Sequence, residues 1–105
     1  MPTNHANIYI TEQIVATRAL LKFCKEHNYK SQWLKDIESC LIFLEKNEID
    51  SAIEFYKKVP LGGNNCFNDW NPPIIYQNED QEYVSTVFAA LVAFWSLRMS
   101  LSLGK

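Results

Sequence analysis

The sequence predicts an all-α protein: a four-helix bundle with a long ordered loop between its third and fourth helices. Four segments carry apolar residues at helical spacing. Gly and Pro number only 3 and 4, too few for a turn-rich β-sandwich. With 105 residues, 48% of them hydrophobic, the chain is expected to form one domain, 1–105, whose core needs neither disulfides nor metal.

The first two helices are expected at about 8–27 and 32–46. Apolar residues recur in both at steps of three and four, the spacing of one helix face. The first helix carries Ile10, Ile14, Leu21 and Cys24, and the second Leu34, Ile37, Leu41 and Leu44. Ser31 is expected to cap the second helix at its N-terminus.

The third helix is expected at about 48–58, capped by Asn47 and stopped by Pro60. The fourth is expected at about 79–101, where Asn78 and Gln81 resemble a capping box. Its main face is expected to consist of Val84, Val87, Phe88, Leu91, Trp95 and Arg98. This apolar pattern predicts that the fourth helix lies at the centre of the bundle.

The fourth helix also has the length of a membrane span, since Arg98 is the only charge in 84–103. Four serines, one threonine and the cost of an arginine within the bilayer argue against a tail anchor there. The N-terminus lacks the basic and apolar pattern of a signal peptide. We therefore expect a cytoplasmic protein with no membrane partner.

Charge and cysteine content exclude several function classes. The net charge is −2, so nucleic acid is not an expected partner. Cys24, Cys40 and Cys66 are odd in number and lack metal-binding spacing, which predicts reduced thiols, no metal and no cofactor. An enzyme would need Cys66 with His27 as its base, but a histidine at a helix end more often interacts with the dipole. We expect no enzyme.

The loop at 59–77 is long for so small a domain, which is typical of a functional segment. Residues 62–70 of this loop have two interpretations, which are compatible. In the first, Phe67 and Trp70 fill the core and the loop caps its own backbone. In the second, the loop is a rigid recognition element. The recognition residues are then Asn64, Asn65, Asn68, Asp69 and Trp70, joined by Glu79, Asp80 and Glu82 at the start of the fourth helix. These acids are either a solvated face or a patch that steers a basic partner.

The loop resembles a motif of small bacterial immunity-type proteins, Gly-Gly-Met-Gly-Ser-Leu/Phe-Asn-Asp. Matching positions are Gly62, Gly63, Phe67, Asn68 and Asp69, whereas Asn64, Asn65 and Cys66 replace Met, Gly and Ser. The helix order is also similar to that of helical immunity proteins of type VI secretion effectors. The resemblance covers the chain from about Asp50 onward.

The resemblance implies a cytoplasmic, non-enzymatic immunity protein that binds and neutralises a cognate toxin domain. The alternative is a small helical adaptor or regulatory protein that dimerises through a helix face, and a homodimer is compatible with either function.

Overall fold

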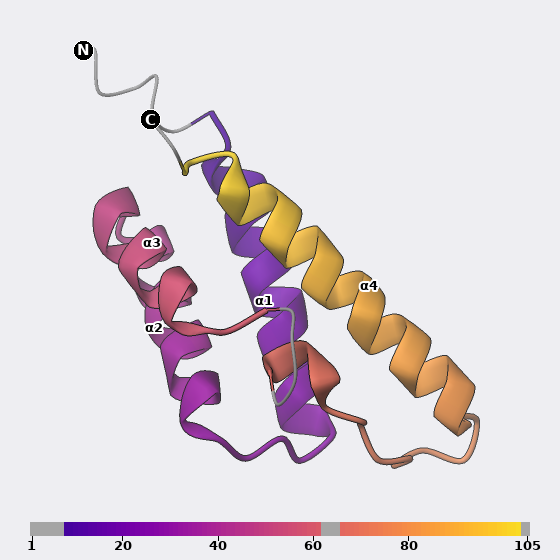
Figure 1. Ribbon diagram of the computed structural model, residues 1–105. Helices are drawn as coiled ribbons and strands as arrows, with labels where there is room; N and C mark the ends of the chain where they lie inside the picture. Colours follow the sequence, from indigo (N-terminus) through magenta and orange to yellow (C-terminus); the bar gives the residue numbers. More distant parts are fainter. Residues whose placement is uncertain (1–7, 62–65, 104–105) are drawn as a thin grey trace.

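The computed structural model describes residues 8–61 and 66–103, which form four α-helices (Figure 1). The elements in chain order are α1 (Ile10–Glu26), α2 (Gln32–Glu45), α3 (Ile49–Lys58), a short 3₁₀ helix η2 (Phe67–Asp69) and α4 (Gln81–Ser100). No strand occurs within these two described ranges. The predicted all-α class, and the loop between the third and fourth helices, are confirmed.

The helix ends agree with the sequence at α2 and differ from it at α3. The Ser31 hydroxyl accepts a hydrogen bond from the Trp33 N–H at 3.2 Å, so the predicted cap is confirmed. Asn47 was wrongly predicted to cap α3. It adopts φ 63°, a left-handed conformation that asparagine tolerates, and follows the end of α2, while Glu48 takes the cap position of α3.

The start of α4 also differs from the predicted one. Asp80 is the cap, because its Oδ1 accepts a hydrogen bond from the Tyr83 N–H at 2.7 Å. The helix therefore begins at Gln81, two residues later than predicted, and Asn78 and Glu79 belong to the preceding turn. Glu79 is thereby available for another contact.

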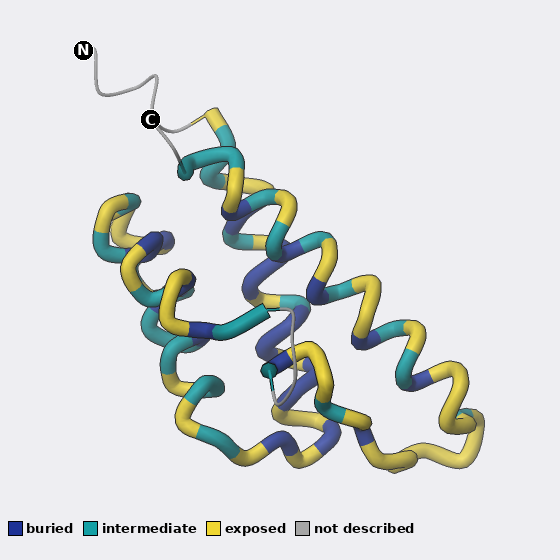
Figure 2. The backbone as a smooth tube through the Cα atoms, viewed as in Figure 1, coloured by how far each residue is buried: buried dark blue, intermediate teal, exposed yellow. Residues whose placement is uncertain are grey.

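The central helix is α1, not α4 as predicted. It packs against α2 on one side and α4 on the other, and α2 in turn packs against α3 (Figure 1). The buried residues of α4 form one narrow stripe, Val84, Phe88, Val92, Trp95 and Met99. The opposite side of α4 stays exposed (Figure 2). The prediction failed because most residues on the outward side are apolar or small, so the sequence of α4 resembles that of a helix buried on all sides.

Contacts from two helices hold α4 in place. Trp95 Nε1 donates to the Thr17 hydroxyl at 2.9 Å, and that hydroxyl donates to the Gln13 carbonyl at 2.7 Å. Gln13 Nε2 in turn donates to the Arg98 carbonyl at 3.0 Å, which ties α1 to the last turns of α4. From α3, the Tyr56 ring meets Trp95 edge-on at 5.0 Å. Because buried polar groups need partners, this network fixes how α4 sits on α1.

Within the described residues, α4 is the one helix whose length and apolar composition would suit a membrane span. Of the most apolar 18-residue stretch of this helix, 28% is buried inside the protein.

Candidate functional site

The loop between α3 and α4 is anchored by aromatic side chains. Phe67 of η2 is 0% exposed, and its ring lies edge-on to Tyr29 and to Phe88, both at 5.3 Å between centroids. Trp70 is half-buried and lies edge-on to Phe88 at 5.1 Å. Aromatic pairs of this geometry add to the stability gained from burial. Phe67 and Trp70 thus fill the core, as the self-capping interpretation predicts.

The predicted contact residues are placed unequally. Asn64 and Asn65 lie outside the described residues. Four others are exposed: Asn68, Asp69, Asp80 and Glu82. Since η2 packs on Phe88 and Gln81 Nε2 donates to the Pro72 carbonyl at 3.0 Å, the loop runs beside the first two turns of α4.

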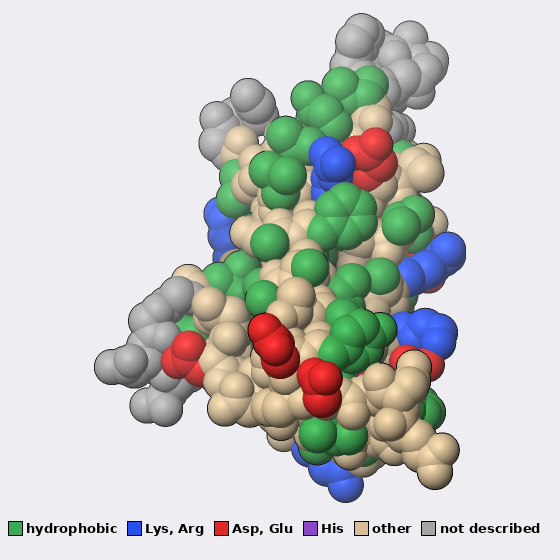
Figure 3. All heavy atoms as spheres, turned by 90° about the vertical axis from the view of Figure 1, so that its right-hand side faces the viewer, with side chains coloured by type: hydrophobic (Ala, Val, Ile, Leu, Met, Phe, Trp, Pro, Cys, Tyr) green, Lys and Arg blue, Asp and Glu red, His purple; other side chains and the backbone are tan. Residues whose placement is uncertain are grey.

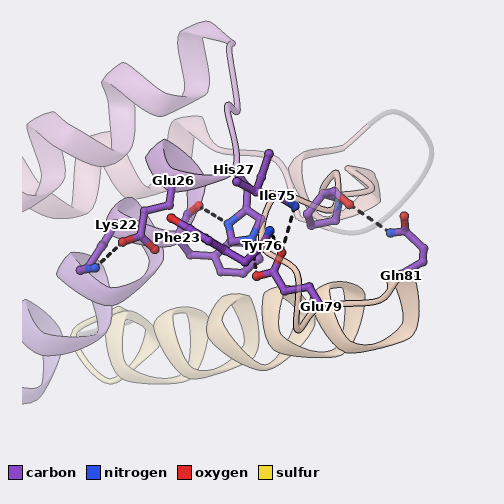
Figure 4. Close-up of polar contacts among 9 residues, drawn as sticks. Lys22, Phe23, Glu26, His27, Ile75, Tyr76, Glu79 and Gln81 are labelled. Carbon is purple, nitrogen blue, oxygen red and sulfur yellow. Dashed lines mark hydrogen bonds and ion pairs between the residues drawn. The ribbon is translucent and has the colours of Figure 1, made fainter.

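Glu79 is placed differently from the other predicted residues. Its side chain is 7% exposed, and its Oε2 lies 2.9 Å from Nε2 of His27, whose side chain is 3% exposed (Figure 4). The other carboxylate oxygen, Oε1, accepts hydrogen bonds from the N–H groups of Ile75 at 3.0 Å and Tyr76 at 3.2 Å. We call the pair the His27–Glu79 clasp. It joins the end of α1 to the segment that precedes α4.

The clasp is held by hydrogen bonds on both of its side chains. His27 Nδ1 lies 3.0 Å from the Phe23 carbonyl, which can only accept. Burial alone would raise the pKa of Glu79, but hydrogen bonds from Ile75, His27 and Tyr76 outweigh it and hold that pKa below its ordinary value. The carboxylate of Glu79 therefore has three hydrogen-bonding partners around it: His27 on one oxygen and the two backbone N–H groups on the other.

Aromatic rings enclose the imidazole of the clasp. The Phe23 ring stacks on it at 4.0 Å between centroids with an interplanar angle of 20°, and the Tyr76 ring meets it edge-on at 6.0 Å. Both ring nitrogens are already engaged, so His27 has no nitrogen left to act as a base for Cys66. The clasp is a positioning element.

The segment held by the clasp exposes three consecutive large apolar side chains. Ile74 is 50% exposed, Ile75 41% and Tyr76 48%. We call these three residues the apolar tip. Sequence reasoning did not include them in the site. The available signal was a run of large apolar residues, bounded by Pro73 and Gln77, that belongs to no helical face.

A depression between α1 and α2 is lined by cations that already have acidic partners. The depression between α1 and α2 has a volume of about 380 Å³ and an apolar floor that includes Leu21 and Leu41. Its three cations are already paired with acids: Arg18 with Glu45, Lys22 with Glu26 and Lys25 with Glu38. Among residues 8–61 and 66–103, no three His, Cys, Asp or Glu side chains gather in a way that suits a metal ion.

The cysteines are expected to differ in reactivity. Cys24 and Cys40 are 0% exposed, and burial raises the pKa of each thiol to about 12, whereas Cys66 is half-buried in the loop. Since the thiolate is the reactive form, iodoacetamide should label Cys66 first at pH 8. Mass spectrometry of timed digests checks the order. Labelling of Cys24 or Cys40 at the rate of Cys66 would contradict the packing of α1 and α2.

Comparisons of the chain with protein-family models, curated proteins and solved structures give no match. The resemblance to immunity-type proteins therefore stays a prediction that rests on the loop motif and the helix order. What the structure adds is an exposed and ordered apolar tip with acids on the neighbouring turns.

Proposed function

We propose that this chain is an immunity-type protein that binds and neutralises a cognate bacterial toxin domain without catalysing a reaction. The observation that carries the proposal is the apolar tip, whose three large side chains are 41–50% exposed although their backbone is held by the buried clasp. Exposed apolar groups on a fixed backbone suit a protein–protein contact.

The tip and the nearby acids have separate roles in this proposal. Apolar and aromatic side chains at the centre of an interface supply most of the binding energy, which assigns the anchor role to the tip. Charges at the rim set the encounter rate and the choice of partner. Asp69, Asp80 and Glu82 are exposed and supply negative charge, so the proposed partner presents a basic surface. Asn64, Asn65, Asn68 and Trp70 complete the proposed contact set.

Glu79 enters the proposal as a positioning residue and not as a contact. Its carboxylate is buried against His27, and its bonds to the Ile75 and Tyr76 N–H groups fix the backbone of the tip. A segment that is ordered before binding loses less conformational entropy when the partner arrives. The clasp thus supports affinity without touching the partner.

Co-expression with the product of the neighbouring gene tests the proposal. The chain is expected to restore growth of cells that produce this toxin and to co-purify with it through two chromatographic steps. Replacing the apolar tip by three serines should abolish both effects while the melting temperature is unchanged. The adaptor alternative predicts neither growth rescue nor co-purification.

A further inference from the structure

The outward side of α4 is largely apolar and carries charge only near its two ends. Of its 20 residues only Glu82 and Arg98 carry charge, one in the first turn and one in the last. Tyr83 is 52% exposed and Leu97 56%, and Ala90 and Ala93 between them are also exposed. Figure 3 shows the hydrophobic side chains continuing along this side of the molecule. A soluble chain rarely leaves so long an apolar face uncovered.

The apolar residues of this face keep the spacing of a helix–helix seam. The positions follow steps of four, three, four and three, the repeat of a coiled-coil interface. We call them the α4 seam: Tyr83, Val87, Ala90, Phe94 and Leu97. Tyr83, Ala90 and Leu97 are exposed, and Val87 and Phe94 are half-buried at the edge of the core. Large residues stand at both ends and alanine at the middle, so two such faces can approach closely at their centres. The pattern suits another helix of similar length.

The charges at the two ends select the direction of that helix. Asp80 caps the N-terminal end, and Arg98 lies eighteen positions later, about five turns, on the same side of α4. The Arg98 guanidinium meets Glu12 at 3.2 Å and stays 31% exposed. An antiparallel copy of α4 would bring Arg98 of each chain beside Asp80 of the other. A parallel copy would place like charges together, and its helix dipoles would repel.

We propose that two copies of this chain associate through the α4 seam as an antiparallel, two-fold symmetric dimer. A two-fold interface must be complementary to itself, and this face has acid at one end, base at the other and apolar residues between. The dimer uses a different face from the apolar tip, apart from Asp80 at their border. Because Asp80 belongs to both surfaces, variants at Ala90 and Leu97, which leave the tip and its acids unchanged, separate the dimer from the proposed toxin-binding function.

Light scattering after size-exclusion chromatography tests the dimer. The measured mass of the wild-type chain is expected to be twice its 12.2 kDa monomer mass. The variants Ala90→Glu and Leu97→Glu are expected to have the monomer mass and unchanged helicity. Ile42→Glu is the matched control, because Ile42 is 49% exposed on α2 and should leave the dimer intact. A wild-type chain that is monomeric at 100 μM would overturn the proposal. So would a seam variant that remains dimeric.

A cross-linking experiment tests the antiparallel direction. Tyr83→Cys and Leu97→Cys are made separately in a Cys66→Ser background, and the two variants are mixed and allowed to exchange subunits. A short bis-maleimide should join residue 83 of one chain to residue 97 of the other, with little product in either variant alone. Products that join 83 to 83 or 97 to 97 would overturn the antiparallel arrangement.

A lipid bilayer could also cover the apolar face of α4. Sedimentation with vesicles of phosphatidylcholine and phosphatidylglycerol distinguishes membrane binding from the dimer. We expect the dimer to remain in the supernatant. Cosedimentation of the wild-type chain that Ala90→Glu abolishes would assign the face to lipid and overturn the dimer.

Discussion

Phe67→Ala is expected to lower the free energy of unfolding by about 3–5 kcal/mol, the usual effect of removing a fully buried phenylalanine. Phe67 is 0% exposed and joins three parts of the chain: the loop, Tyr29 after α1, and Phe88 of α4. Urea unfolding followed by circular dichroism measures the loss.

The control for this variant is Ile42→Ala. Ile42 is 49% exposed on α2, so its truncation should change the free energy of unfolding by less than about 0.5 kcal/mol. If Phe67→Ala is no more destabilising than Ile42→Ala, η2 does not serve as a plug and the loop is not anchored as described.

Glu79→Gln is expected to destabilise the fold at neutral pH and to weaken its acid dependence. The amide puts an NH₂ group where one carboxylate oxygen faced either His27 or the two backbone N–H groups, so a buried acceptor is lost. In the wild type, the pKa of Glu79 is lower in the folded than in the unfolded chain. Its ionised form therefore adds stability above the ordinary pKa of a glutamate, and this contribution disappears as the pH falls through the lowered, folded-state value.

Urea unfolding at several pH values between 3 and 7 checks this expectation. The stability of the wild type should fall more steeply on acidification than that of Glu79→Gln. Glu38→Gln is the matched control, because the Lys25–Glu38 pair is well exposed, with side chains 53% and 38% accessible, and should behave like wild type. Equal pH slopes for wild type and Glu79→Gln would contradict the clasp.

The helices were predictable because their patterns are local. In α2, for example, Ile37 and Leu44 belong to the apolar face and are buried, and Ser31 caps the helix as expected. Which helix lies in the middle was not predictable from periodicity. An alanine that faces a neighbour and an alanine that faces water read alike in a sequence, so Ala90 and Ala93 made α4 look central although both are exposed.

The candidate site was predictable in part for a similar reason. The exposure of Asp69 and Glu82 follows from the polar sequence around each of them. The burial of Glu79 depends on His27, which lies 52 positions earlier, and no local pattern links the two. The apolar tip was missed because its exposure follows from that distant contact, which fixes the backbone at Ile75 and Tyr76.

The affinity of the chain for its purified cognate toxin domain, measured by isothermal titration calorimetry, tests the proposed binding surface most directly. A triple variant, Ile74→Ser with Ile75→Ser and Tyr76→Ser, keeps the backbone N–H groups that Glu79 binds. We predict that it binds at least about 100-fold more weakly than wild type, or about 2.7 kcal/mol, as expected for the loss of central anchors. Ile42→Ser, the matched exposed control, should bind like wild type. An unchanged affinity of the triple variant, at an unaltered melting temperature, would contradict the assignment of the tip.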